Sequence, residues 1–170
     1  ALIPEYHLFD IGGYATASKT WERWTLNGGL RYDNRHLKHD QTNRFDGVTG
    51  SVGMVWNADD HWNVRLNVAR GFRAPNMSEL GADGVHEGTV RYELGNANLK
   101  SEFSWQADMG VDFTSHYVSA QVALFANRIE NYIFTKRINV VMEEGYNTYE
   151  YTQGDARLLG FEAGVDVHPM

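Results

Sequence analysis

Strict alternation of apolar and polar residues is the feature that most constrains the fold of this chain. In the run 103–113 every odd position is apolar, and every even position is Ser, Gln, Asp or Gly. A helix would spread these two sets around its circumference, whereas a strand places each set on its own face. The run therefore predicts a β-strand with Trp105, Met109 and Val111 on one side.

Six further segments alternate in the same way, so the chain is predicted to be all-β. The seven expected strands cover residues 6–18, 23–36, 45–57, 62–73, 102–114, 117–134 and 146–168. We expect Leu66, Trp105, Met109, Val111 and Val122 on one common face, and Arg65, Gln106, Asp108 and Gln121 on the other. No window of helical period is free of a glycine break or a competing alternation, so no helix is predicted. The strands should form an antiparallel meander in which neighbours in sequence pair in space.

The lengths of the strands and of their connections favour a membrane barrel. Several strands exceed the roughly five or six residues usual in soluble sheets, and a strand that crosses a bilayer needs about 9–11 residues. Tight polar turns at 18–22, 58–61 and 115–116 alternate with longer connections at 37–44, 74–101 and about 135–145. Short turns on one side and long loops on the other are typical of bacterial outer-membrane barrels.

Aromatic residues cluster at the strand ends beside the short turns. They are Trp21, Trp24, Trp56, Trp62, Phe113 and Tyr117. Amphipathic rings are enriched at headgroup depth, so this placement predicts an interfacial girdle. A soluble β-sandwich or lipocalin-like barrel with its apolar face inward has the same period, and alternation alone does not separate the two. Strand length, unequal connections and aromatic placement favour the membrane.

Composition excludes several classes of function. The absence of cysteine excludes a disulfide framework, a thiol nucleophile and a Cys-based zinc site. A formal net charge of −7 argues against a nucleic-acid partner, which would require a basic surface. No nucleophile elbow, metalloprotease motif or phosphate-binding glycine loop is present, so we expect no enzyme and no resident cofactor.

Charged side chains on the polar face form a second group of interest. They are Arg23, Arg31, Asp33, Arg65, Arg73, Asp108, Asp112, Glu162 and Asp166. In a barrel this face lines the interior. They could contact a plug or a substrate, but for most of them we expect cross-strand ion pairs on a water-exposed inner surface of the barrel.

Histidines give the one indication of a metal site. His36 and His39 stand at the edge of a loop, and His86 lies in the longest loop beside Asp83 and Glu87. Imidazole and carboxylate groups form a plausible zinc-binding set if these loops meet at one mouth. The alternative is that all five are solvated loop residues, because no spacing here fixes a coordination geometry.

Four motifs in order resemble the barrel domain of TonB-dependent outer-membrane receptors. Residues 68–80 (VARGFRAPNMSEL) resemble the family's "GFRAP…EL", and residues 91–102 (RYELGNANLKSE) resemble "YExGNxxLKxE". Residues 125–133 (FANRIENYI) and 154–162 (GDARLLGFE) resemble the strand motifs "FxNxIxNYI" and "GxAxxxGxE". The match covers about residues 68–167. Pro75 fits the motif physically, because proline cannot donate to a ladder and so ends strand pairing.

The resemblance implies a bacterial outer-membrane barrel of about 22 strands, of which residues 1–170 are a single segment. Its plug domain and TonB box are absent from this chain, and an odd number of strands also indicates a piece of a longer protein. The implied function is TonB-energised uptake of a scarce nutrient such as a metal, a ferric siderophore or haem. The implied partners are outer-membrane lipid, TonB and the substrate, while the isolated piece should self-associate. The alternative is a structural or adhesive barrel, or a soluble β-barrel binding protein, without active transport.

The loop after "EL" is similar to that of a subgroup of zinc receptors, in which a His-bearing loop follows the motif. This resemblance makes zinc or an iron complex a possible transported substrate and His86 the leading candidate ligand. The expected extracellular substrate loop contains Glu79, Asp83, His86, Glu87, Arg91, Tyr92 and Glu93.

Overall fold

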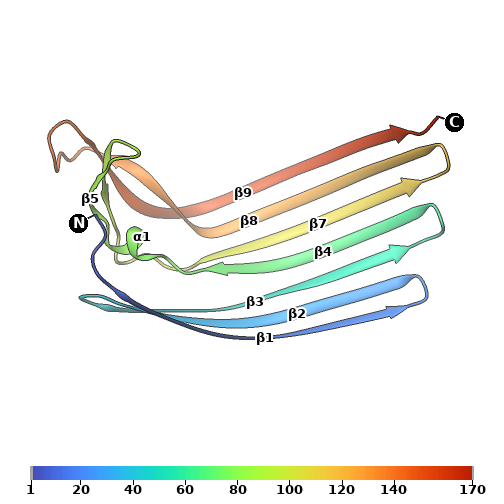
Figure 1. The fold of residues 1–170 in the computed structure, drawn as a ribbon, viewed down its shortest axis with the longest axis horizontal. Coiled ribbons are helices and arrows are strands. Elements are labelled where there is room, and N and C mark those ends of the chain that lie inside the picture. The colour runs from blue at the N-terminus through green and yellow to red at the C-terminus, as the bar shows by residue number, and fades with distance from the viewer. Residues whose placement is uncertain (1, 170) are drawn as a thin grey trace.

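The computed structural model describes residues 2–169, which form one curved sheet of nine strands (Figure 1). The strands are β1 (His7–Trp21), β2 (Trp24–Lys38), β3 (Thr42–Asn57), β4 (Trp62–Arg73), β5 (Asp83–His86), β6 (Arg91–Leu94), β7 (Glu102–Thr114), β8 (Val118–Ile138) and β9 (Asn147–Val167). A five-residue helix, α1 (Met77–Gly81), precedes β5. Hydrogen-bonded neighbours follow the order β1-β2-β3-β4-β7-β8-β9-β6-β5.

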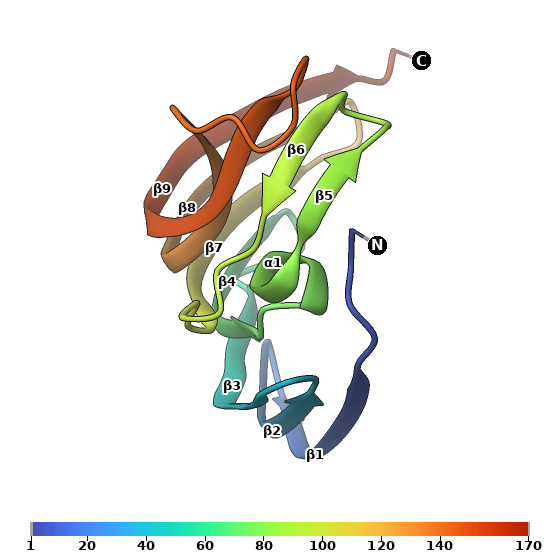
Figure 2. The same ribbon diagram turned by 90° about the vertical axis from the view of Figure 1, so that its left-hand side faces the viewer.

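All seven predicted strands are present, and they form the predicted antiparallel meander. Tight turns lie at one end of the long strands and the longer loops at the other (Figure 1). The sheet is curved, and α1, β5 and β6 lie on its concave side at the loop end (Figure 2). The long strands have 12 to 21 residues, enough to cross a bilayer and extend beyond it.

The two faces of the sheet separate polar from apolar side chains as predicted. Leu66, Met109 and Leu124 lie opposite one another across β4, β7 and β8. On the other face Arg65 forms an ion pair with Asp112 at 3.1 Å. Asp108 shares the face of Asp112 because the side-chain period of a strand is two. The predicted assignment of side chains to the two faces is therefore confirmed.

The polar face is the concave one, and the apolar face is convex. On the polar face Arg31 and Asp33 line a groove that they share with Ala74, which leads into α1. On the other face Leu159 and Phe161 are 80% and 74% exposed, although both are large apolar side chains. An exposed apolar band of this size is expected where lipid covers the surface.

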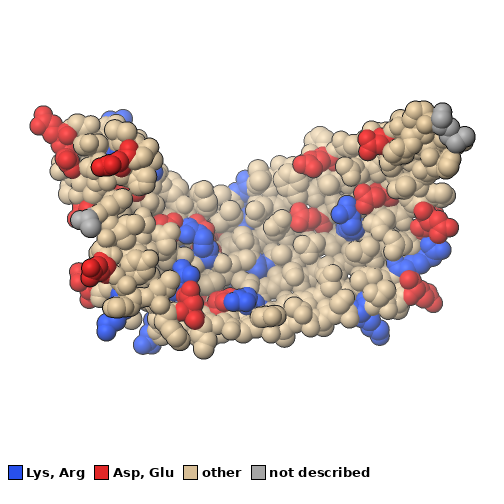
Figure 3. Space-filling model, in the orientation of Figure 1, with Lys and Arg blue, Asp and Glu red and all other residues tan. Residues whose placement is uncertain are grey.

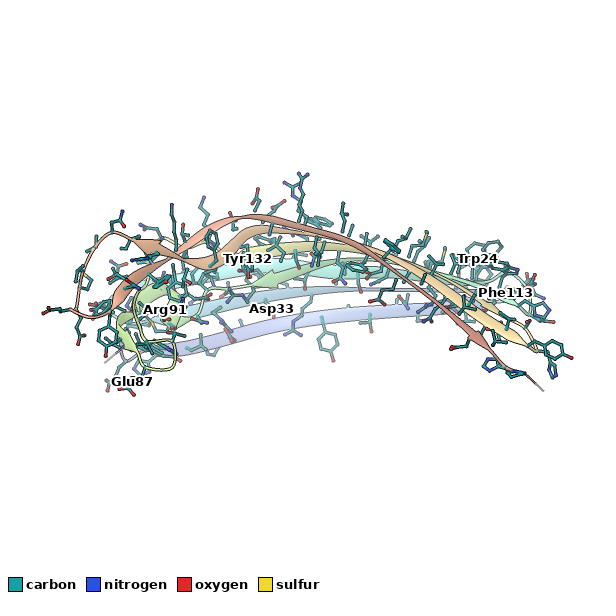
Figure 4. The ribbon with its side chains drawn as sticks, turned by 90° about the horizontal axis from the view of Figure 1, so that it is seen from above. Trp24, Asp33, Glu87, Arg91, Phe113 and Tyr132 are labelled. Atoms are coloured by element: carbon teal, nitrogen blue, oxygen red, sulfur yellow. The ribbon has the colours of Figure 1, made fainter. Side chains whose placement is uncertain are left out.

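Aromatic rings gather at the turn end of the sheet, as the sequence predicts for an interfacial girdle. Trp24 stacks on Trp56 with ring centroids 5.3 Å apart. Trp62 packs against Phe113 at 4.9 Å. Figure 4 places Trp24 and Phe113 together at this end, far from Glu87 and Arg91 in the loops.

The long connections differ from the sequence prediction in three ways. The loop expected at 37–44 is a tight hairpin, because β2 and β3 continue past the expected ends. The loop at 74–101 contains α1, β5 and β6, which are too short to show a period in the sequence. Finally, β6 pairs with β9 in parallel and β4 pairs with β7, so strands that are not consecutive in sequence are neighbours at two places among residues 2–169.

The buried core lies at the loop end and not between the long strands. It consists of Leu37, Phe45, Ala74, Met77, Leu80, Leu99 and Ile133. These side chains join α1 and its flanking segments to the ends of β2, β3 and β8. No helix among residues 2–169 has the length and apolar character needed to cross a bilayer.

Candidate functional site at the loop end

Arg73 holds the loop 74–101 to the barrel wall. Its guanidinium group donates to both carboxylate oxygens of Glu79, at 2.7 and 2.9 Å, and to both of Glu102, at 2.9 and 3.0 Å. Glu79 also forms a capping box with Asn76, in which each side chain accepts from the other residue's backbone N–H at 2.9 and 3.0 Å. The planar guanidinium suits such paired carboxylates, so one residue fixes both the start of α1 and the start of β7.

A close backbone approach ties the end of the loop to α1. The backbone N–H of Gly95 donates to the carbonyl of Ala82 at 2.6 Å, and that of Asn96 donates to Glu79 at 2.8 Å. A Cβ atom at Gly95 would lie 2.5 Å from the backbone nitrogen of Ala82. Only glycine allows this approach without a backbone shift.

The hairpin β5–β6 is anchored to β9 through a buried carboxylate. Glu93 is 3% exposed and accepts from Arg91 at 3.1 Å and from the hydroxyl of Tyr151 at 3.2 Å. The guanidinium of Arg91 also lies over the ring of Tyr149, 4.7 Å from its centroid. Together with the parallel pairing of β6 and β9, these contacts fix the position of the hairpin.

Asp83 and His86 point to opposite faces of this hairpin. They are three residues apart in one strand, and strand side chains alternate with period two. Asp83 accepts a hydrogen bond from the hydroxyl of Tyr92. That bond raises the pKa of Tyr92, because ionisation would break it and place two negative charges side by side. His86 has Thr89 as its partner instead, with 3.2 Å between Nδ1 and the hydroxyl.

The predicted metal ligands are not assembled into one site. Among residues 2–169 no group of three or more His, Asp or Glu side chains is placed to hold a metal ion. His36 packs edge-on against Phe9, with ring centroids 6.4 Å apart. His39 lies in the β2–β3 hairpin, where its Nε2 is buried without a hydrogen-bond partner. Glu87 is exposed at the tip of the β5–β6 hairpin. A metal role for His86 stays a prediction.

Of the expected substrate-loop residues, Glu79 and Glu93 are buried in ion pairs that hold the loop. Tyr92 donates to Asp83 and Arg91 donates to Glu93, so these side chains are occupied within the hairpin. His86 and Glu87 remain at the hairpin's outer end, and Figure 4 shows Glu87 projecting there. The loop thus separates into residues that fix its shape and a polar tip.

Ion pairs line the concave wall below the loop. Arg31 pairs with Asp33 at 2.9 Å, and Arg35 pairs with Asp10 at 2.8 Å. A groove of about 420 Å³ lies between these side chains and Arg73. Figure 3 shows both signs of charge spread over this side of the molecule. The interpretation of these charges as a wet, ion-paired wall is confirmed for Arg31, Asp33, Arg65, Arg73 and Asp112.

Residues 4–168 match the protein family described as "TonB dependent receptor-like, beta-barrel". This chain belongs to that family. Its members are outer-membrane proteins of Gram-negative bacteria, so the convex apolar band faces lipid. The chain is 29% identical over 112 residues to the iron-regulated outer membrane virulence protein of Vibrio cholerae serotype O1 (El Tor Inaba N16961). That alignment covers 65% of this chain and 16% of the curated relative.

Solved structures with the same fold include several receptors and transporters. The FrpB iron transporter from Neisseria meningitidis (F3-3 variant) matches with a TM-score of 0.69 at 20% identity, over 98% of this chain and 25% of that one. The copper transporter OprC matches with a TM-score of 0.79 at 19% identity, over 96% of this chain and 27% of that one. The Serratia marcescens hemophore receptor HasR, solved with its hemophore and heme, matches at 0.77 and 16% identity over 99% and 33%. These likenesses establish the fold.

Sequence reasoning did not find the contacts that hold the loop. The alternation predicts Arg73 among the charges of the wall but does not identify it as the partner of Glu79 and Glu102. The spacing of Asn76 and Glu79 is that of a capping box, and this local signal could have revealed α1. The contact between Glu93 and Tyr151 spans 58 residues, and no local pattern predicts it.

Proposed function

We propose that the protein is an outer-membrane, TonB-energised receptor that takes up a scarce metal as a complex, with an iron complex such as a ferric siderophore or haem foremost. The observation that carries the proposal is the arrangement at the loop end. Arg73 and Glu93 fix a folded loop, and the polar tip at His86 and Glu87 stands at the mouth of a charged concave wall. A rigid loop with an exposed polar tip suits contact with an incoming solute.

The names of the similar proteins support this class of cargo. The curated relative is called iron-regulated, and the structural neighbours are titled an iron transporter, a copper transporter and a hemophore receptor. Residues 2–169 alone hold no group of three or more His, Asp or Glu side chains placed to bind a bare ion. Energy would come from TonB acting on a plug segment outside this chain.

Growth under iron limitation tests the proposal. A strain that lacks the full-length gene is grown in chelated medium with haem, single ferric siderophores or zinc supplied in turn. We expect restored growth on one iron complex when the gene is returned, and no restoration in a strain without TonB. Growth that is independent of the gene on every cargo would favour a structural or adhesive barrel.

A hairpin variant links uptake to this loop. We expect His86→Ala with Glu87→Ala to lower uptake of that cargo while the amount of folded receptor is unchanged. Asp60→Ala, at the tight turn on the opposite end, is the matched control and should leave uptake unchanged. Zinc titration by calorimetry of the full-length receptor and of His86→Ala separates the bare-ion alternative. If His86→Ala lowers the affinity for zinc, the transported substrate is zinc and not an iron complex.

A further inference from the structure

Three arginines and a tryptophan form one row across the convex face. Arg70 on β4 lies opposite Trp105 on β7, which lies opposite Arg128 on β8, which lies opposite Arg157 on β9. The next row toward the turns is apolar and contains Val68, Ala107, Ala126 and Leu159, also mutually opposite. On every strand the two rows are two positions apart. Because side chains alternate between faces, the arginines share the apolar face.

On β8 and β9 this row marks the outer edge of the apolar band, whereas on β4 and β7 Phe72 and Phe103 lie one step nearer the loops on the same face. On β8 and β9 the outward positions from the turns up to Ala126 and Leu159 are all apolar, and Arg128 and Arg157 come next. The loops lie beyond them on the same end of the sheet (Figure 1). Arginine side chains at the edge of a hydrocarbon layer extend their charge into the headgroup region, where phosphates are found.

Two of these arginines face each other without a compensating charge between them. Arg128 and Arg157 are directly opposite on adjacent strands, where like charges are destabilising. Arg128 reaches Glu130 only at 4.0 Å, and both side chains are at least 40% exposed. Among residues 2–169 no carboxylate lies within 4.0 Å of Arg157, and Asp155 instead accepts from the backbone of Asn131 at 3.4 Å. An anion between the two guanidinium groups would relieve the repulsion.

Arg70 is fixed in place and carries an unused donor. Its guanidinium lies 4.3 Å from the ring centroid of Phe103 and 5.5 Å from that of Trp105. It donates to the carbonyl of Val48 at 2.9 Å, but its Nε is buried and has no partner. The two aromatic rings and the bond to Val48 hold this guanidinium group in place on the convex face.

An apolar groove opens beside Arg70 on the same face. It has a volume of about 510 Å³ and is lined by Leu30, Val48, Val52, Val68 and Trp105, with Gly28 and Gly50 on the same face. The small residues leave room that larger side chains would fill. A groove in the apolar band next to a basic edge has the form expected for one acyl chain below a charged headgroup.

We infer that this row binds the phosphorylated headgroup of an outer-leaflet glycolipid, with an acyl chain in the groove beside Arg70. Guanidinium groups bind phosphate through paired, charge-assisted hydrogen bonds. Strands lie about 5 Å apart, so Arg128 and Arg157 can share one phosphate, while Arg70, about 10 Å from Arg128, reaches a second. The groove selects a lipid over free phosphate, because inorganic phosphate has nothing to place in it.

Native mass spectrometry of the delipidated full-length receptor tests this site with lipid A that carries both phosphates. We expect Arg128→Gln with Arg157→Gln to weaken binding by about tenfold or more, as for loss of a strong charge-assisted contact. Arg137→Gln is the matched control, because Arg137 lies on β8 beyond the band and donates to Asn147. It should bind as the wild type does, and lipid A without phosphates should bind weakly to all variants.

Each other outcome contradicts the inference. Equal affinity of the double variant and the wild type would show that the arginines only extend into the interface. If millimolar inorganic phosphate displaces lipid A, the arginines recognise phosphate alone and the groove does not select a lipid. A heat-modifiability gel verifies that the variants are folded. If the double glutamine variant fails this check, Arg128→Lys with Arg157→Lys keeps the charge, and it must retain more binding than Arg157→Gln alone.

Discussion

Arg73 donates to Glu79 and Glu102 at once, and this double ion pair is the contact that joins the mouth loop to the barrel. The side chains of Glu79 and Glu102 are 11% and 12% exposed. Removal of the arginine would leave two nearly buried carboxylates facing each other. We expect Arg73→Ala to destabilise the folded loop locally by about 1–3 kcal/mol, the cost of unpaired groups of this kind.

Hydrogen exchange of the full-length receptor measures this change. Amides of residues 76–96 should exchange faster in Arg73→Ala, while those in the middle of β7 should not. Arg73→Lys keeps the charge without the planar fork, so an intermediate result is expected. Equal protection in all three proteins would show that the core cluster alone holds the loop.

Gly95 gives a second test of the same loop. We expect Gly95→Ala to push the chain away from α1, because the new Cβ would meet backbone atoms of residues 80–82 that cannot rotate aside. The cost should be about 1–3 kcal/mol, as for other overpacked sites. Gly13→Ala is the control, since a Cβ there has open space around it. Protease cleavage within residues 77–101 should accelerate only in the Gly95 variant.

The bond between Tyr92 and Asp83 makes the hairpin sensitive to alkaline pH. The pKa of Tyr92 is raised in the folded hairpin by its bond to Asp83, so the bond contributes fully below the ordinary tyrosine pKa of about 10. Its contribution is lost as the pH rises through the raised value. The chain has no cysteine, so a spin label at Glu87→Cys reports on this segment alone.

We expect the label to become more mobile above about pH 10 in the wild-type hairpin. With Tyr92→Phe it should already be mobile at neutral pH and show no such step. If both proteins show a rise in mobility of the same size, the rise comes from titration of groups other than Tyr92. The measurement is the electron paramagnetic resonance linewidth as a function of pH.

Much of the fold could be predicted from the sequence because long strands carry a local period of two. The short elements α1, β5 and β6 could not, since contacts distant in sequence, such as Glu93 with Tyr151, decide their place. The five candidate metal ligands do not lie together among residues 2–169 for a related reason, and their metal role stays a prediction. Once residues 83–86 form a strand, Asp83 and His86 must face apart. Buried pairs such as Arg73 with Glu79 depend on a turn that periodicity does not report.

The assignment of the two faces predicts opposite effects for adjacent residues on β8. Leu124 lies on the convex face, opposite Met109 and Phe161. Leu124→Arg should lower the free energy of unfolding by about 2–4 kcal/mol, as for an arginine at the midplane of a membrane barrel. Ala123→Arg is the matched control, because residue 123 is on the concave face with Glu162 directly opposite. Urea unfolding of the full-length receptor in bilayers measures the free energy of unfolding of both variants. If Ala123→Arg is the more destabilising of the two, the assignment of the lipid-facing side is wrong.

The 170-residue chain studied alone should self-associate. In the described part of the chain, residues 2–169, one side of β1 has no strand beside it, and β9 is covered by β6 only along residues 147–150. Such open edges pair with other chains, and the exposed apolar band adds a second cause of association. Light scattering separates the two causes, because detergent covers the band but not the edges. We expect aggregates without detergent and a dimer or small oligomer with it. A monodisperse monomer without detergent would contradict the lipid-facing assignment of the convex face.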